Sequence, residues 1–472
     1  MENQNKRITH VMVLICFLFL CIVVYLTYFE VFVKDKILTS SYNRRQWEQE
    51  DTTLRGSILD RNGVVLAKST MDENKQERIY PYGSLYSQVI GYNSKAYGKS
   101  LMELYYNNEL LNIREYSSIF NFKEKLSGEL KTGNNLYLTI DHKLQEKAEQ
   151  LLRGKNGAVV AMRPKTGEIL AMVSKPDFDP SSTKLAQNWE ELIKSKDSPF
   201  LPRATQGLYV PGSTFKVLTA AAAVENGMED RTFDDKGSIT IDGKIFNNFN
   251  SHVYGNLDLK SALAVSSNVA FAQIGSELGE KVLKEIAVRV GMNREIPFDI
   301  PLNSSRFPYE SMGKTDLAAV GMGQGKLLVT PLHMAMIASG IGNNGIIMKP
   351  YLVDRVVSSS DITQKSVKPD KFSQIMSPET AQKVKDMMQY VVETGTGKGA
   401  AIKGVKIAGK TGTAENELSS KQKNKEHAWF ICFAPVDDPQ VAVAVVLEYS
   451  GSTGGALAAP IARDLMRQVL GK

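Results

Sequence analysis

The sequence predicts an α/β fold of the α+β type: an antiparallel sheet flanked by helices, with a small N-terminal module and one transmembrane helix. Three observations support this prediction. An uncharged apolar run lies near the N-terminus, strand-like runs are joined by hairpin turns, and apolar helical segments alternate with strands along the rest of the chain. With 472 residues, 23% charged and 43% hydrophobic, the chain has the size and composition of two or three globular domains.

Charge and cysteine content argue against several classes of protein. The net charge of +6 is spread over 57 basic and 51 acidic residues, which is too dilute to indicate nucleic-acid binding. Three cysteines cannot form a disulfide framework or a zinc site, and the five histidines show no metal-ligand spacing. We therefore expect no metal, no cofactor and no nucleic-acid partner.

The N-terminal apolar run is long enough to cross a membrane. Residues 11–29 carry no charge, and a helix of that length spans a hydrocarbon core of about 30 Å. Because Lys6 and Arg7 precede the run, the positive-inside rule predicts a cytoplasmic tail at residues 1–10, an anchor at residues 11–33 and the rest of the chain outside. A cleaved signal peptide is disfavoured, since the run exceeds the usual ~7–15 residues and no small-x-small cleavage site follows.

A linker and a small N-terminal module are predicted over residues 34–151. Residues 35–55 are polar and typical of a linker or helical stalk. An Asn-Gly pair at residues 62–63 separates two short strand-like runs, which predicts a hairpin. Residues 100–111 have the pattern of a helix.

The larger domain is predicted over residues 152–472. Hairpin-connected strands mixed with apolar helices favour an antiparallel sheet with helices packed on it. Its clearest elements are two strand pairs and a closing helix, at residues 157–162 with 168–173, 429–434 with 441–449, and 457–470.

A serine and a lysine one helical turn apart form the first candidate for chemistry. Ser-x-x-Lys occurs four times, starting at Ser181, Ser213, Ser311 and Ser420, but only Ser213 follows Pro-Gly and begins a strongly apolar helix. Ser213 and Lys216 then share one face, and burial would lower the pKa of Lys216 enough to make it a base for the Ser213 hydroxyl. An N-capping serine followed by a lysine that reaches solvent would give the same local pattern.

Lys-Thr-Gly occurs three times, and its context separates the copies. Those starting at Lys131 and Lys165 are typical of turns. The third, at residues 410–412, lies in a β-like run of small residues, where a ligand backbone could lie against the strand edge. Alternation along this strand predicts that Lys410 and Gly412 face away from Thr411 and Thr413.

Ser-x-Asn occurs twice. One copy starts at Ser41, in the predicted linker, and the other is Ser266-Ser267-Asn268, in an alanine-rich helical segment. Each of the three patterns is a weak signal alone.

Taken in order, Ser213-x-x-Lys216, Ser266-x-Asn268 and Lys410-Thr411-Gly412 form the triplet of penicillin-binding proteins and serine β-lactamases. The chain resembles a class B penicillin-binding protein, a bacterial cell-wall transpeptidase, in a short form. Further stretches resemble that class in the same order, at residues 55–63, 97–105, 138–145, 157–160, 166–172, 321–325, 330–331 and 395–397.

The resemblance implies a peptidoglycan D,D-transpeptidase that works through an acyl-enzyme on Ser213. Lys216 would accept the proton of the Ser213 hydroxyl, Ser266 would pass a proton to the leaving amine, and Asn268 would bind the substrate backbone and orient Lys216. Substrate-binding roles are implied for Lys410, Thr411, Gly412 and Thr413, with the oxyanion hole formed by the backbone N–H groups of Ser213 and Thr413.

The resemblance also implies partners and leaves alternatives. The expected ligands are peptidoglycan stem peptides ending in D-alanyl-D-alanine and the β-lactams that mimic them, and the expected partner is a SEDS-type glycosyltransferase, because no polymerising domain fits in the chain.

A D,D-carboxypeptidase or a β-lactamase would use the same triplet and let water release the acyl group. A receptor with a penicillin-binding sensor domain would need several membrane spans, and a scaffold with a dead site is disfavoured because every triplet residue is present.

Overall fold

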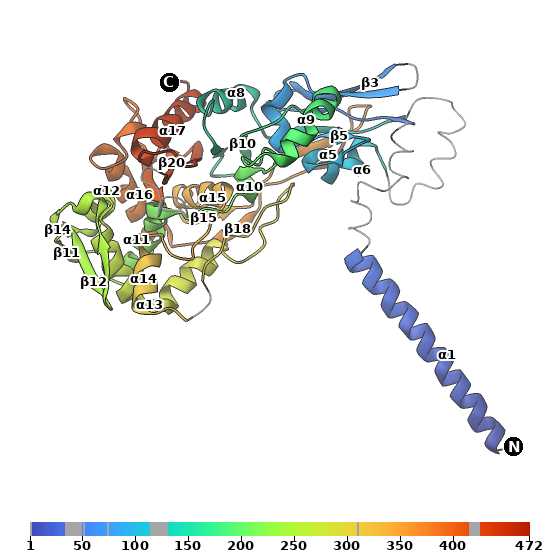
Figure 1. Cartoon of the computed structure of the whole chain (residues 1–472), viewed down its shortest axis with the longest axis horizontal. Coiled ribbons are helices and arrows are strands. Elements are labelled where there is room, and N and C mark those ends of the chain that lie inside the picture. Colours follow the sequence, from blue (N-terminus) through green and yellow to red (C-terminus); the bar gives the residue numbers. More distant parts are fainter. Residues whose placement is uncertain are drawn as a thin grey trace.

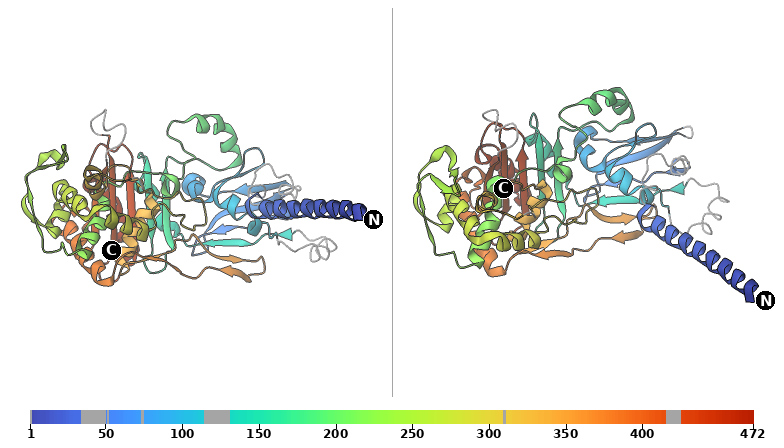
Figure 2. Two further views of the ribbon diagram at one scale, coloured as in Figure 1. Left: turned by 90° about the horizontal axis from the view of Figure 1, so that it is seen from below. Right: turned by 60° about the horizontal axis from the view of Figure 1, so that its bottom comes forward.

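A long helix projects from one end of an elongated molecule in the computed structural model of the chain (Figure 1). The structure describes residues 2–33, 50, 52–72, 75–113, 131–308, 311–414 and 425–472. The N-terminal module lies between helix α1 and the larger domain, and the C-terminus lies on the larger domain (Figures 1 and 2). Most of the predicted linker at residues 35–55 falls outside the described residues.

The projecting helix α1 (Glu2–Tyr28) continues into a π-helical turn, η1 (Phe29–Val33). It is the one helix of the described chain that is long and apolar enough to cross a membrane: within Asn5–Val33, an 18-residue stretch has a mean hydropathy of 2.8 and none of that stretch is buried inside the protein. Its exposed leucine, valine and phenylalanine side chains are consistent with a single-pass membrane protein.

The N-terminal module is built on a six-stranded sheet with the order β17-β16-β8-β2-β3-β4. The predicted hairpin is present as β2 and β3, which pair antiparallel on either side of the turn at residues 62–63, and β8 pairs parallel with β2. The six strands are β2 (Ile58–Leu59), β3 (Val65–Asp72), β4 (Lys75–Ile79), β8 (Asn135–Leu138), β16 (Val353–Val357) and β17 (Thr363–Ser366).

The helix predicted over residues 100–111 is instead two short helices, α5 (Leu101–Tyr105) and α6 (Asn107–Leu110). Tyr106 lies between them with φ −107° and ψ 21°, outside the helical region, and its hydroxyl donates a hydrogen bond to Asp299 of the larger domain. A long-range contact therefore lies at the break in a segment whose local pattern indicates one helix.

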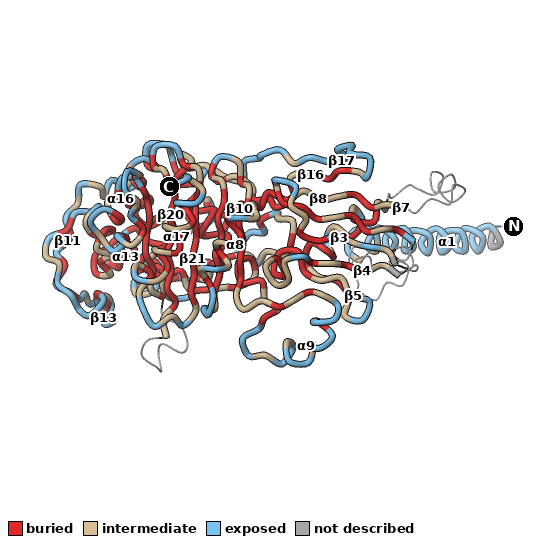
Figure 3. Tube along the Cα trace, turned by 90° about the horizontal axis from the view of Figure 1, so that it is seen from above, coloured by how far each residue is buried: buried red, intermediate tan, exposed pale blue. Residues whose placement is uncertain are grey.

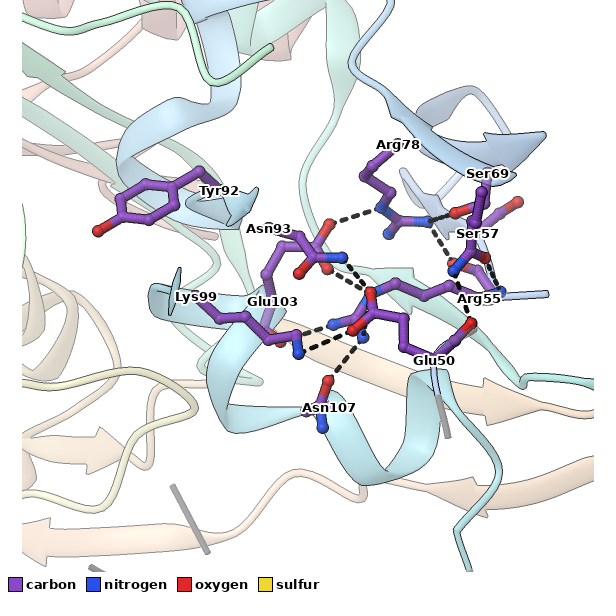
Figure 4. Close-up of polar contacts among 12 residues, drawn as sticks. Glu50, Arg55, Ser57, Ser69, Arg78, Tyr92, Asn93, Lys99, Glu103 and Asn107 are labelled. Atoms are coloured by element: carbon purple, nitrogen blue, oxygen red, sulfur yellow. Dashed lines mark hydrogen bonds and ion pairs between the residues drawn. The ribbon is translucent and has the colours of Figure 1, made fainter. Parts of the chain in front are cut away.

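A buried ionic cluster joins two segments of this module that are distant in sequence (Figure 4). The Glu103 carboxylate accepts hydrogen bonds from Arg55 Nε at 2.6 Å and Arg78 Nε at 2.7 Å. Arg55 also donates to Asn107 Oδ1 at 2.6 Å, and Glu103 and Arg55 have fully buried side chains. The cluster ties α5 and α6 to the strands that follow Arg55.

Two segments pack differently from the predicted division at residues 151 and 152. Strands β16 and β17 come from residues 353–366 but extend the sheet of the N-terminal module, since β16 pairs with β8. Helix α8 (His142–Leu151), in contrast, packs on the sheet of the larger domain. Strand pairing between distant segments leaves no local sequence pattern, so neither feature could be read from periodicity.

The larger domain contains a five-stranded antiparallel sheet with the order β10-β9-β21-β20-β19. Apart from β19, its strands are mostly apolar because helices cover both faces, and Figure 3 shows β10, β20 and β21 as largely buried. The strands are β9 (Gly157–Met162), β10 (Ile169–Lys175), β19 (Ala408–Ala414), β20 (His427–Ala434) and β21 (Val441–Leu447). The predicted strand over 441–449 ends at Leu447, and Tyr449 has a positive φ of 46°.

Alternate residues of each strand belong to two separate cores. Val159, Val443 and Phe430 pack with helices α8 and α17 (Gly454–Leu470), while Val160, Ala444 and Ile431 pack in the larger core that contains the remaining helices. The main helices on that side are α11 (Lys216–Glu225), α12 (Leu259–Val265), α13 (Asn268–Val290), α14 (Lys314–Gly321), α15 (Pro331–Gly342) and α16 (Pro378–Glu393).

A small all-β region is inserted between α11 and α12. Strands β11 (Thr232–Asp235) and β14 (Gly255–Asp258) pair with each other, and β12 (Ser238–Ile241) and β13 (Lys244–Asn247) form a hairpin between them. The shorter elements elsewhere are β1 (Thr53–Leu54), β5 (Asn93–Ser94), β6 (Gly98–Lys99), β7 (Lys131–Thr132), β15 (Ile346–Met348), β18 (Lys371–Gln374), α4 (Ser87–Ile90), α9 (Ser182–Lys194) and α10 (Arg203–Gln206), with single turns η2 (Gly83–Tyr86), η3 (Gly212–Phe215), η4 (Phe249–Ser251) and η5 (Lys398–Ala400).

Candidate active site

Ser213 lies in the 3₁₀ turn η3, immediately before helix α11, and lines a cavity of about 930 Å³. The turn packs tightly against β19. A Cβ on Gly212, which has φ +54°, would lie 2.7 Å from the Thr413 carbonyl oxygen, so only glycine fits there. The Pro-Gly pair that marks Ser213 in the sequence therefore lets the serine approach the strand that carries Lys410.

Lys216 is the first residue of α11 and is fully buried beneath the cavity. Its Nζ donates to the Ser266 carbonyl oxygen and to Asn268 Oδ1, both at 2.8 Å, and lies 3.4 Å from Ser266 Oγ. These bonds join the Ser-x-x-Lys and Ser-x-Asn segments as the sequence predicts. A lysine reaching solvent, the alternative interpretation, is wrong because the side chain has no exposed surface.

Ser266 and Asn268 lie at the junction between two helices. Helix α12 ends at Val265, Ser266 has the left-handed conformation with φ 61° and ψ 39°, and α13 begins at Asn268. Ser267 caps α13, since its hydroxyl accepts from the Ala270 N–H at 2.9 Å. The reversal at Ser266 places its hydroxyl between the two lysines of the site.

Lys410, on strand β19, completes this arrangement. Its Nζ donates to Ser266 Oγ at 2.9 Å and to the Thr411 carbonyl oxygen at 3.0 Å. Ser266 Oγ is therefore shared by Lys410 and Lys216, and the three sequence segments meet at one hydroxyl. Strand β19 is at the edge of its sheet, which leaves one side of its backbone beside the cavity.

The faces of β19 follow the predicted alternation. Thr411 and Thr413 line the cavity, and Thr411 Oγ1 lies 2.7 Å from Thr396 Oγ1. Gly412 faces the turn that carries Ser213, because a Cβ there would lie 2.9 Å from Thr214 Cγ2. The small residue thus permits close packing of the strand against η3.

Burial controls the electrostatics of the site. It lowers the pKa of Lys216 well below 10.5, the nearby charge of Lys410 lowers it further, and the carboxylate of Asp235 acts in the opposite direction. Burial also lowers the pKa of Lys410 to about 7. Among the described residues no carboxylate is bonded to either Nζ, so neutral lysine is stabilised here.

Comparisons with known proteins decide the family. A family model of the penicillin-binding protein transpeptidase domain matches residues 157–467, and a model of the penicillin-binding protein A dimerisation domain matches residues 55–136. The peptidoglycan D,D-transpeptidase PbpA of Mycolicibacterium smegmatis is 34% identical, over 99% of this chain and 99% of its own. The chain belongs to the penicillin-binding protein transpeptidase family.

Solved structures are similar to this penicillin-binding protein over most of its length. Penicillin-binding protein A from M. tuberculosis, in a ceftriaxone acyl-enzyme complex, is 32% identical with a TM-score of 0.84, over 89% of this chain and 99% of that one. The D,D-transpeptidase domain of a peptidoglycan glycosyltransferase from Eggerthella lenta is 36% identical with a TM-score of 0.79, over 89% and 99% of the two chains. The predicted fold and the predicted class, a D,D-transpeptidase acting as a serine acyltransferase, are confirmed.

The other copies of the short motifs lie elsewhere in this penicillin-binding protein. Ser181 precedes α9 and Ser311 is exposed before α14, whereas Ser41 and Ser420 fall outside the described residues. Lys165 lies in the turn between β9 and β10, where its Nζ bonds Asp438, and Lys131 begins β7. None of the described copies lines the cavity.

Sequence reasoning missed several residues around the cavity of this penicillin-binding protein. Thr396 contacts Thr411, and in the sequence residues 395–397 stand out only as a stretch that resembles the family. Asp235 and Asn248 support the Ser266–Asn268 turn from the inserted β region, and no local motif marks either one. No group of histidine, cysteine, aspartate and glutamate that could hold a metal ion is found in the part of the chain that the structure describes.

Proposed function

We propose that this protein cross-links peptidoglycan through an acyl-enzyme on Ser213. Ser213 Oγ attacks the carbonyl carbon between the two terminal D-alanines of a stem peptide, and neutral Lys216 accepts the hydroxyl proton. The C–N bond then breaks, and the terminal D-alanine leaves as an amine that takes a proton through Ser266. The observation that carries this proposal is the Ser266 hydroxyl, shared by Lys216 and Lys410 beside the cavity that Ser213 lines.

The second half of the reaction forms the cross-link. An amine of a neighbouring stem peptide attacks the acyl carbon and gives up a proton to neutral Lys216. A new amide bond forms, the ester bond to Ser213 breaks, and Lys216 passes the proton to Ser213 Oγ. Because burial lowers the pKa of Lys216 well below 10.5, its neutral form is more accessible than that of an exposed lysine, which lets it take up and return this proton.

Substrate recognition is assigned to the edge strand β19. Charged Lys410, with the hydroxyls of Thr411 and Thr413, would bind the terminal carboxylate of the substrate, and Gly412 would let the peptide lie close to the strand. The backbone N–H groups of Ser213 and Thr413 would form the oxyanion hole, where one donor contributes about 3–4 kcal/mol. The same site would bind β-lactams.

A D,D-carboxypeptidase or β-lactamase would use the same residues. The N-terminal module, which the dimerisation-domain model matches over residues 55–136, favours the cross-linking enzyme. Supplying a donor stem peptide with and without an acceptor amine separates the two, because only a transpeptidase forms the cross-linked product in preference to the hydrolysed one.

Labelling with a fluorescent penicillin tests the acyl-enzyme. The full-length protein in detergent should bind the label in a one-to-one ratio, and mass spectrometry should place the adduct on the peptide that contains Ser213. Ser213→Ala should abolish labelling, and Ser311→Ala, at an exposed copy of the same motif, should leave it unchanged. Labelling that survives Ser213→Ala would contradict the proposal.

The apolar helix is proposed to anchor the protein with Lys6 and Arg7 in the cytoplasm and the catalytic domain outside the cell membrane. An N-terminal tag should then be reached by antibody only after the membrane is permeabilised. Access of the antibody to the tag in intact spheroplasts would show that the N-terminus lies outside, which contradicts the proposed orientation.

A SEDS-type glycosyltransferase is the partner that we propose for this helix, since the cross-linker needs newly made glycan strands. Tyr25, Thr27, Tyr28 and Glu30, near the outer end, are the expected contacts; interfacial anchoring would also place tyrosines there. Replacing residues 11–33 with an unrelated single-span helix should reduce co-purification with the glycosyltransferase. Unchanged association would limit the helix to anchoring.

A further inference from the structure

A buried carboxylate lies behind the Ser266–Asn268 turn, on the inserted β region. Asp235, the last residue of β11, has no exposed surface, whereas the preceding Asp234 is exposed. The Asp235 carboxylate accepts four hydrogen bonds from three donor groups, all of them neutral. They come from Gly237 N at 2.9 Å, from Asn248 Nδ2 at 2.7 and 2.9 Å, and from Ser267 Oγ at 2.5 Å.

Asn248 connects this carboxylate to the start of helix α13. Its Oδ1 accepts from the backbone N–H of Asn268 at 2.8 Å and of Val269 at 3.2 Å. Its Nδ2 donates to Asp235 and to the His252 carbonyl oxygen at 2.8 Å, so the amide orientation is fixed by partners on both sides. Asn268 Nδ2 donates in turn to the Asn247 carbonyl oxygen at 2.8 Å.

These bonds hold a turn whose backbone is unfavourable. Ser266 has a left-handed φ of 61°, a conformation that a serine adopts only when its surroundings impose it. Ser267, the next residue, is held because its hydroxyl donates a hydrogen bond to Asp235. Asn268 is held because its backbone N–H donates to Asn248 Oδ1. If these anchors were lost, the Ser266 hydroxyl would leave its position between Lys216 and Lys410.

We infer that Asp235 and Asn248 are positioning residues of the transpeptidase, which hold the Ser266 hydroxyl and the Asn268 amide in place against Lys216. The inference rests on the proposed roles of Ser266 and Asn268. Neither residue forms a hydrogen bond with Ser213, Lys216 or Lys410, although Asn248 also lines the cavity, and both act through the turn between α12 and α13.

The position of Asp235 gives it an electrostatic effect as well. The ionisable groups that face it are Lys216 from α11 and Tyr254 next to β14, and Lys410 from β19 faces Lys216. The Asp235 charge raises the pKa of Lys216, against the larger effects of burial and of Lys410. Removing the charge should therefore let Lys216 lose its proton at a lower pH.

The test compares Asp235→Asn with Asp234→Asn, its exposed neighbour on β11, in the full-length protein in detergent. The second-order rate constant for acylation by a penicillin should fall about tenfold or more in Asp235→Asn, because a shifted catalytic group costs that much. The acid limb of its pH profile should also move to lower pH. Asp234→Asn should match the wild type in both rate and profile.

Asn248→Ala separates positioning from charge. It removes the bonds to the Asn268 and Val269 N–H groups but keeps the Asp235 carboxylate, so acylation should fall while the acid limb keeps its pH or moves up. The role of Asp235 is overturned if the acylation rate constant of folded Asp235→Asn falls less than tenfold. It is also overturned if the rate constant falls but the acid limb of the pH profile does not move to lower pH. If Asp235→Asn does not fold, Asn248→Ala decides, and a wild-type rate there overturns the inference. Failure of the proposed function itself would appear separately, as an adduct on a residue other than Ser213.

Discussion

The N-terminal module and the active site both bury charged side chains, but they treat the charge in opposite ways. In the module, burial would raise the pKa of Glu103, yet the charges and hydrogen bonds of Arg78 and Arg55 outweigh it and the pKa is lowered. In the active site, Lys216 and Lys410 are equally buried and bond only to neutral oxygens, so their pKa values fall. The first arrangement keeps its groups ionised, and the second lowers the pKa of both lysines, which makes Lys216 available as a base.

The comparison indicates what each cluster contributes. A buried ion pair is costly to break and has little freedom to change its protonation, which suits a structural joint between Arg55 and α5. Burial without an acid partner lowers the pKa of a lysine, which suits a base. Stability should therefore respond to changes in the module, and the acylation rate to changes in the active site.

The largest effect is expected from Lys216→Ala. Loss of the base should lower the second-order rate constant for acylation by penicillin about 10²–10⁴-fold, since a positioned proton acceptor contributes that much. Stopped-flow or gel-based labelling of the full-length protein measures it. Lys314→Ala, at the exposed lysine of another Ser-x-x-Lys copy, should acylate at the wild-type rate. Wild-type acylation in Lys216→Ala would place the base elsewhere.

Glu103→Gln should affect stability and leave the chemistry intact. Arg55 and Arg78, both buried, would lose the carboxylate that they bond, and breaking such a buried ion pair lowers the free energy of unfolding by about 3–5 kcal/mol. Denaturant unfolding of the full-length protein measures the loss, and the folded fraction should acylate as fast as the wild type. Glu77→Gln, at an exposed acid on β4, is the matched control. A slower acylation by folded Glu103→Gln would show that the two regions are coupled.

Lys410→Ala should produce a smaller change in rate than Lys216→Ala. The variant loses a charge-assisted bond to the substrate carboxylate, about 1.5–3 kcal/mol, while Thr411 and Thr413 still contribute to recognition. The acylation rate constant should fall by roughly 10- to 100-fold. Lys165→Ala, at an exposed lysine of another Lys-Thr-Gly copy, should have no effect. A loss as large as that of Lys216→Ala would indicate that Lys410 takes part in proton transfer.

Local patterns in the sequence were enough to predict many strands and helices, whereas the candidate triplet was predicted from the resemblance of three distant segments to a known family. The Asn-Gly turn indicates the hairpin of β2 and β3, the continuous apolar runs indicate β20 and β21, and the apolar helix after Ser213 singles out Lys216. Each of these signals lies within a few residues of the feature that it predicts, so periodicity and turn chemistry are sufficient.

Features formed by distant segments could not be predicted in this way. Strand β16 joins β8 although more than two hundred residues separate them, and Ser267 meets Asp235 across 32 positions. Tyr106 interrupts a helical pattern where it bonds Asp299, 193 residues away. The burial of Arg55 with Glu103 likewise depends on a chain path that neither of their motifs encodes alone.

The pH dependence of acylation tests the central claim, that the site uses two buried lysines to which no carboxylate of the described chain is bonded. Lys216 acts as the base, and charged Lys410 binds the substrate carboxylate. Acylation needs neutral Lys216, so the rate constant for acylation should rise with pH as Lys216 loses its proton, well below pH 10.5. Acylation also needs charged Lys410, so the rate constant should fall as the pH rises past about 7 and Lys410 loses its proton. We therefore predict a bell-shaped profile for the full-length protein. A single ascending limb centred near pH 10.5, the value of an ordinary lysine, would contradict the account.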